Sequence, residues 1–155
     1  MATVSLAVPM FLAILLQAGG PPAGPMPDSL SSVERSRLAA AEKIDKRIKI
    51  YTEASDDRRR SVEKAVAEKN FDAIAVILRS WKEVLDYSLS DIQANAGQRS
   101  RSRALKDYEI RLRKAMGVMS DLKTKGSYEQ FEEFESWLEH AGEVQKKLVA
   151  ILFPG

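Results

Sequence analysis

Apolar side chains recur every three or four residues over most of the chain, the spacing that places them on one face of an α-helix. None of these stretches shows the period-two alternation that indicates a β-strand. The sequence therefore predicts an all-α protein. The positions that define the pattern are Ala41, Ile44, Ile48, Tyr51, Val62 and Ala65 in the first stretch, and Phe131, Phe134, Leu138, Ala141, Leu148 and Leu152 in the last.

Capping signals give the ends of the predicted helices, because short polar side chains can accept hydrogen bonds from the free amides of a first turn. Together with the apolar spacing they predict an elongated antiparallel bundle of three long helices, over about 31–69, 71–124 and 127–152. The candidate capping boxes are Ser31 with Glu34 and Ser127 with Gln130, the third candidate N-cap is Asn70, and the candidate C-cap is Gly126.

The central segment is ambiguous because its apolar stripe rotates by about 100° near 95–102. A turn at Ala96-Gly97 would explain the rotation and give a four-helix bundle. One continuous helix whose halves face different partners would explain it as well. We favour the continuous helix, since one glycine without a proline makes a poor loop. The cluster of charges at 56–60 contains no glycine or proline, so it is predicted to stay helical.

The first 27 residues differ from the rest in composition. They contain no charged side chain and five of the six prolines, whereas residues 28–153 contain no proline. The apolar run 4–18 has the length of a secretory h-region and is short of the ~20 residues that span a bilayer. The predicted organisation is a signal peptide over 1–20, a Pro/Gly-rich linker of polyproline type over 21–30 and one helical domain over 31–153.

Export follows as the expected localisation, periplasmic or extracellular, with cleavage between about 18 and 23. The alternatives are an uncleaved membrane anchor and a buried N-terminal helix. In the cleaved form we expect no transmembrane helix.

Charge is nearly balanced, with 24 Lys and Arg against 22 Asp and Glu, so a dedicated nucleic-acid binder is not expected. The bases concentrate in residues 98–125, which hold nine against three acids, and the acids in 126–155, which hold six against two bases. A hairpin at Gly126 is predicted to pair these opposite charges. The possible contacts to an anionic surface are Arg99, Arg103, Lys106 and Arg113.

Candidate chemistry is sparse. The chain has no cysteine and a single histidine, His140, so disulfides, Cys-ligated metals and thiol nucleophiles are excluded. Trp137 occupies the place that a glutamate of a Glu-x-x-His di-iron unit would need. The acids at the start of the last helix are explained by the helix dipole rather than by a metal. We predict no catalytic, metal or cofactor-binding residues, and no cofactor.

The functional hypothesis is therefore a non-enzymatic interaction or structural role in the cell envelope. A protein partner or self-association is expected, and an anionic envelope surface is a second kind of target. The alternative is a four-helix bundle that carries a small molecule or cofactor, for which an internal cavity would be needed. Tyr128, at the start of the last helix, is expected to pack under the adjoining helix end.

Overall fold

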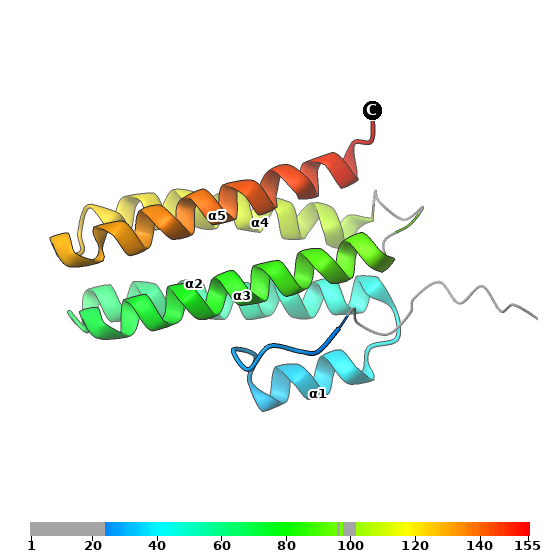
Figure 1. Cartoon of the computed structure of the whole chain (residues 1–155), viewed down its shortest axis with the longest axis horizontal. Coiled ribbons are helices and arrows are strands. Elements are labelled where there is room, and N and C mark those ends of the chain that lie inside the picture. Colours follow the sequence, from blue (N-terminus) through cyan, green and yellow to red (C-terminus); the bar gives the residue numbers. More distant parts are fainter. Residues whose placement is uncertain (1–23, 96, 98–101) are drawn as a thin grey trace, which may run out of the picture.

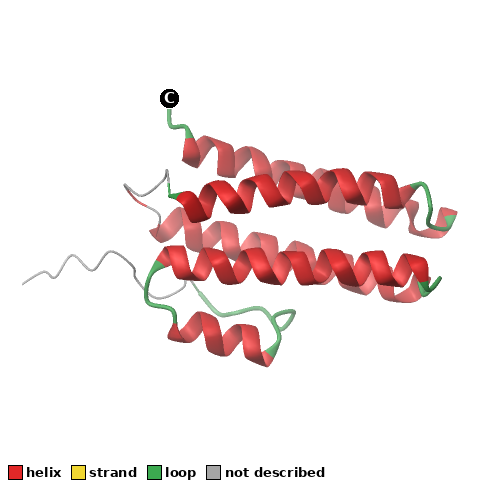
Figure 2. Cartoon of the chain, turned by 180° about the vertical axis from the view of Figure 1, so that it is seen from behind, coloured by secondary structure: helices red, strands yellow, loops and turns green. Residues whose placement is uncertain are grey.

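A computed structural model describes residues 24–95, 97 and 102–155. This part of the chain forms five helices and no strand (Figures 1 and 2), which confirms the all-α prediction. The helices are α1 (Ser32–Ala40), α2 (Ile44–Ala67), α3 (Phe71–Asn95), α4 (Arg103–Lys123) and α5 (Tyr128–Leu152).

The four long helices pack as a closed ring of neighbours. α2 contacts α3 and α4, and α5 contacts the same two helices from the other side. α1 lies outside this ring, against α2 (Figure 1). The apolar stripes read from the sequence line the interior of the ring, where Ile48, Leu78, Leu112 and Leu148 are all buried.

The predicted helix over 31–69 is divided into α1 and α2. The break lies at residues 41–43, where Ala41 has an extended backbone. No proline or glycine marks it in the sequence. Instead, one guanidinium nitrogen of the buried Arg47 donates hydrogen bonds to the carbonyls of Ala41 and Glu42. These carbonyls lie just past the end of α1, so a charged side chain satisfies backbone groups that a continuous helix would have paired. The segment 56–60 is helical as predicted.

The favoured continuous helix over 71–124 is also wrong: α3 ends at Asn95 and α4 begins at Arg103. Ser102 caps α4, because its hydroxyl accepts a hydrogen bond from the Leu105 amide at 3.1 Å. The rotation of the apolar stripe thus coincides with a change of helix. Gly97 has a positive φ of 44°. Ala96 and residues 98–101 lie outside the described residues.

The predicted caps have different outcomes. The predicted capping box is present: the Ser31 hydroxyl accepts a hydrogen bond from the Glu34 amide, and the Glu34 carboxylate accepts one from the Ser31 amide. The box at Ser127 is not formed, because its hydroxyl donates to the side chain of Gln130 and accepts no backbone amide. The C-cap of α4 is Thr124 and not the predicted Gly126, which lies two residues further on and donates its amide to the carbonyl of Leu122.

The turn between α2 and α3 is closed by Lys69, which has a φ of +54°. The Asn70 amide donates to the Ala65 carbonyl and the Lys69 amide to the Val66 carbonyl. This is the hydrogen-bond pattern of a Schellman motif, whose left-handed position is usually a glycine.

The described part of the predicted linker, residues 24–30, lies along the helical body. Leu30 is 1% exposed, and Met26 packs against the core. Residues 1–23, which contain the predicted signal peptide, lie outside the described residues. Among the five helices, none combines the length and the apolar content that a bilayer crossing requires.

Candidate interaction faces

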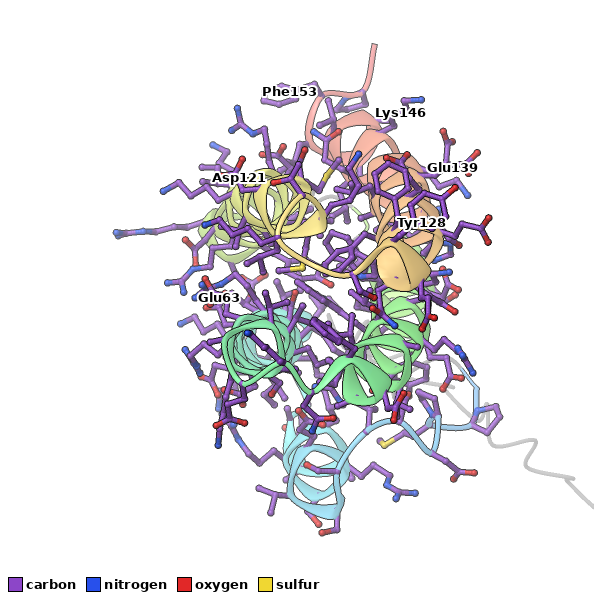
Figure 3. The ribbon with its side chains drawn as sticks, turned by 90° about the vertical axis from the view of Figure 1, so that its left-hand side faces the viewer. Glu63, Asp121, Tyr128, Glu139, Lys146 and Phe153 are labelled. Atoms are coloured by element: carbon purple, nitrogen blue, oxygen red, sulfur yellow. The ribbon has the colours of Figure 1, made fainter. Side chains whose placement is uncertain are left out.

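The packing separates the charges of the helices into two sides. α2 and α4 are neighbours and together hold thirteen Lys and Arg against eight Asp and Glu. α3 and α5 are neighbours and hold four against ten. One side of the body therefore carries a net +5 and the opposite side a net −6. Figure 3, which looks along the helices, shows α2 and α4 on the left and α3 and α5 on the right.

Two aromatic side chains stand exposed on the negative side. Tyr128 is 92% exposed and Phe131 40%, so the expectation that Tyr128 packs under a helix end is wrong. We call the surface around them the acidic face; it is an open surface formed by α5 alone. Its residues are Tyr128, Glu129, Phe131, Glu132, Glu135, Ser136, Leu138 and Glu139.

Lys123 fixes the position of the Phe131 ring. Its ammonium nitrogen lies 4.8 Å from the ring centroid and also pairs with Glu135. A cation held over an aromatic face is an attractive contact, and here it joins the end of α4 to the start of α5. The exposed ring is therefore held in one orientation at the junction of the two helices.

The sequence-predicted basic residues are only partly brought together. Arg103, Lys106 and Arg113 are exposed on α4, and Arg99 lies outside the described residues. Arg113 lies 3.4 Å from Glu109 of its own helix. No ion pair to Arg103 or Lys106 is found in the described ranges. These two charges are therefore available to solvent or to another molecule.

An apolar side chain lies among these bases. Ile110 is 37% exposed, with Lys106 one turn before it and Lys114 one turn after it on the same face of α4. It lines a groove of about 400 Å³ between α2 and α4, together with Lys114 and Val118. We call the surface of Arg103, Lys106, Ile110 and Lys114 the basic face.

The predicted pairing of charge between α4 and α5 occurs at one point. The two helices pack together, and Lys123 pairs with Glu135. Arg111 of α4 has no ionic partner among the described residues of α5. It pairs with Asp56 of α2 at 2.6 Å and with Asp107 of its own helix at 3.1 Å. The exposed faces of two adjacent helices point away from each other, so most of the opposite charges stay unpaired across this hairpin.

Indole rings fill the centre of the ring of helices. Trp81 and Trp137 lie with ring centroids 4.2 Å apart, both fully buried. A ligand held between the helices would have to displace them, so the carrier hypothesis gains no support. His140 shares a hydrogen bond of 2.7 Å with Asp86, and no group of three acidic or histidine side chains is placed to hold a metal in the described residues.

A buried polar cluster lies at the end of the bundle near the α1–α2 break. The Arg47 guanidinium donates to both carboxylate oxygens of Asp91, at 2.7 and 3.0 Å. The Tyr51 hydroxyl donates to the same carboxylate at 2.7 Å, and Asn95 adds a further hydrogen bond. Burial and the adjacent Asp91 carboxylate raise the pKa of Tyr51 far above its ordinary value. The cluster is saturated with hydrogen bonds, so its role is structural.

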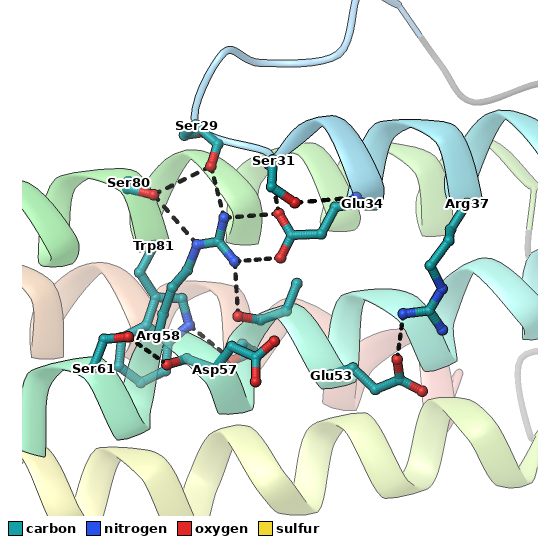
Figure 4. A network of polar contacts seen from close by, with 12 residues as sticks. Ser29, Ser31, Glu34, Arg37, Glu53, Asp57, Arg58, Ser61, Ser80 and Trp81 are labelled. Carbon is teal, nitrogen blue, oxygen red and sulfur yellow. Dashed lines mark hydrogen bonds and ion pairs between the residues drawn. The ribbon is translucent and has the colours of Figure 1, made fainter. Parts of the chain in front are cut away.

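A second polar cluster fastens α1 and the preceding residues to the bundle (Figure 4). Arg58 of α2 contacts both oxygens of Glu34, at 2.8 and 3.1 Å, and donates to the Ser29 carbonyl at 2.6 Å. Burial opposes the ionisation of Glu34, but the hydrogen bonds from Arg58 and from the Ser31 amide outweigh it, so the pKa of Glu34 is lowered. The segment 24–40 is thus held by Arg58, by the ion pair of Arg37 with Glu53 of α2 at 2.6 Å and by apolar contacts such as those of the buried Leu38.

Comparison with protein-family models, with curated proteins and with solved structures finds no match to this chain. The interaction faces therefore rest on the geometry described above. The two exposed aromatic residues were missed at the level of sequence because Phe131 fits the apolar stripe. The available signal was that the apolar residues at 128, 131 and 138 fall on a face of the helix displaced from the buried one at 134, 137 and 141.

Proposed function

We propose that this chain is an exported, non-enzymatic protein of the cell envelope that acts by binding other macromolecules. In this proposal α2 to α5 form a rigid four-helix bundle, and α1 is an accessory arm on its side. The apolar run 4–18 and the proline-rich residues after it support export and a spacer between the leader and the bundle. The predicted cleavage gives a chain that begins between Gly19 and Ala23.

The observation that carries the binding function is the acidic face. Exposed apolar side chains that lie together mark binding surfaces more often than scattered ones do, and tyrosine is enriched among the residues that dominate binding energy. Here Tyr128 and Phe131 are surrounded by carboxylates, which keep the surface hydrated in the free protein. A partner with apolar and basic groups would bury the rings and neutralise the acids at once.

In vivo photo-crosslinking tests this function. A photoreactive phenylalanine analogue replaces Tyr128 in one strain and Val33 in another; Val33 is also exposed but lies on α1. We expect discrete crosslinked species from position 128 and none from position 33. Equal labelling from both positions, or none from position 128, would contradict the proposal.

Export has a separate readout. The intact mass of the protein from the periplasm or the medium should correspond to a chain that begins between Gly19 and Ala23. Protein that retains residues 1–18 and stays in the cytoplasm would contradict the proposed export. The binding function would still be tested separately, by the crosslinking experiment.

A further inference from the structure

The two faces of the molecule are complementary in charge and in apolar content. On α5, Glu129 and Glu132 lie within one turn of Tyr128 and Phe131, and Glu139 lies two turns further along the same surface. On α4, the bases Lys106 and Lys114 flank Ile110. Each face thus offers exposed apolar groups among charges that are mainly of one sign, and this sign is opposite for the two faces, although Asp56 and Asp107 also line the groove at Ile110.

The two faces cannot meet within one molecule. α4 and α5 are adjacent and joined by a short turn, but the acidic face belongs to the α3/α5 side and the basic face to the α2/α4 side (Figure 3). A contact between them requires two molecules.

We propose that the acidic face of one copy docks onto the basic face of a second copy, so that the protein assembles head to tail. The proposal rests on the proposed binding function and names the partner of the acidic face. Because the contact joins two different patches, each copy in a pair keeps one free face, and further copies can add.

The size of the faces sets the strength of this contact. The acidic face spans residues 128–139 of α5 and the basic face residues 103–114 of α4. Each is about 18 Å long and one helix, about 10 Å, wide, so each copy buries about 200 Å². The total of about 400 Å² is well below that of stable specific interfaces, so the contact is weak and transient. Association should therefore be reversible, dependent on concentration and sensitive to salt, since the flanking charges are exposed.

Two variants with reversed charge isolate the contact. The first combines Glu132→Lys with Glu139→Lys and leaves Glu135 in its pair with Lys123. The second combines Arg103→Glu with Lys114→Glu and leaves Arg111 in its pair with Asp56. A matched control, Lys46→Glu with Lys147→Glu, makes the same change in net charge as the second variant at exposed positions outside both faces. Far-ultraviolet circular dichroism establishes that each variant is folded.

Sedimentation velocity of the full chain measures the association. We expect the wild type and the control to exceed the 17.3 kDa monomer as concentration rises, and to return to it in about 1 M salt, where the Debye length is about 3 Å. Each variant alone should associate at least about tenfold more weakly. An equimolar mixture of the two variants should recover association, because one variant then has two positive faces and the other two negative faces.

Other results overturn the inference. Association that persists in both variants places the contact elsewhere, and a mixture that fails to recover association excludes the pairing of these two faces. If the wild type stays monomeric while Tyr128 still gives crosslinked species in cells, self-docking is wrong and the proposed function stands with a different partner. If every crosslinked species from position 128 is a pair of copies of this chain and the mixture associates, the acidic face acts only between copies.

Discussion

Arg47 of α2 and Asp91 of α3 form a bidentate ion pair in which neither side chain is exposed to solvent. The same guanidinium donates to the carbonyls that follow α1. One side chain therefore joins three helices and fixes the point at which the chain leaves α1 and enters α2.

Replacing Arg47 with methionine should strongly destabilise the protein. The substitution leaves the Asp91 carboxylate buried without a cation, a situation that typically costs about 3–5 kcal/mol. Urea unfolding followed by tryptophan fluorescence gives the free energy of unfolding. Arg111→Met is the matched control, because Arg111 pairs with Asp56 and Asp107 at the surface and should lose about 1 kcal/mol or less. Similar losses for the two variants would show that burial of the Arg47 pair is not decisive.

Replacing Lys69 with glycine should stabilise the protein. Lys69 occupies the left-handed region at a φ of +54°, where a side chain with a Cβ costs about 1 kcal/mol that glycine avoids. Thermal and urea unfolding should both show the gain. Lys69→Ala removes the same charge but keeps the Cβ, so it should bring no comparable gain. If alanine stabilises as much as glycine, the effect comes from charge and not from backbone strain.

The attachment of α1 should depend on pH through Glu34. Its pKa is lowered in the folded protein, so its contact with Arg58 contributes fully above the ordinary glutamate value of about 4.3 and is lost as the pH falls through the lowered folded value. Nitrogen-15 relaxation of the α1 amides should report increased motion over that acid range. Glu34→Gln should show increased motion at neutral pH and little further change on acidification. An arm that stays equally rigid in both proteins would contradict the role of this contact.

The two buried tryptophans should differ in their tolerance of phenylalanine. The Trp81 indole donates to the Ser55 hydroxyl at 2.8 Å, whereas the Trp137 indole nitrogen is buried without a partner among the described residues. Both substitutions leave a similar void, but Trp81→Phe also leaves a buried hydroxyl without its donor, which costs about 1–3 kcal/mol more. Adding Ser55→Ala to Trp81→Phe should recover part of that difference. Equal losses for the single variants, by urea unfolding, would contradict this reading.

Much of the fold could be predicted from the sequence because helix formation is local. Three-and-four spacing identified buried positions such as Ile48, Leu78 and Leu148, and the spacing of Ser31 and Glu34 identified a capping box. The rotation of the apolar stripe near 95–102 was compatible with two separate helices and with one continuous helix. The choice between them depended on Ser102, whose hydroxyl accepts the Leu105 amide and begins a separate helix at Arg103.

The break between α1 and α2 had no local signal. No glycine or proline stands at 41–43, and the group that satisfies the free carbonyls there is Arg47, held in place by Asp91 from another helix. A break stabilised by a contact between residues 44 positions apart cannot be read from a pattern that spans a few turns. The same limit applies to Arg58, which binds Glu34 of α1 across 24 positions.

The sequence by itself determined which positions share an apolar face and where along the chain the basic and acidic residues concentrate. Only the tertiary structure decided which helices are neighbours. α2 packs beside α4, and α3 beside α5, so the charge of the chain divides into a basic and an acidic side. Periodicity specifies that a face is buried but not against which partner, because any apolar stripe of matching length gains similar free energy from burial. The contacts that select the partner, such as Arg111 with Asp56, join residues far apart in the chain.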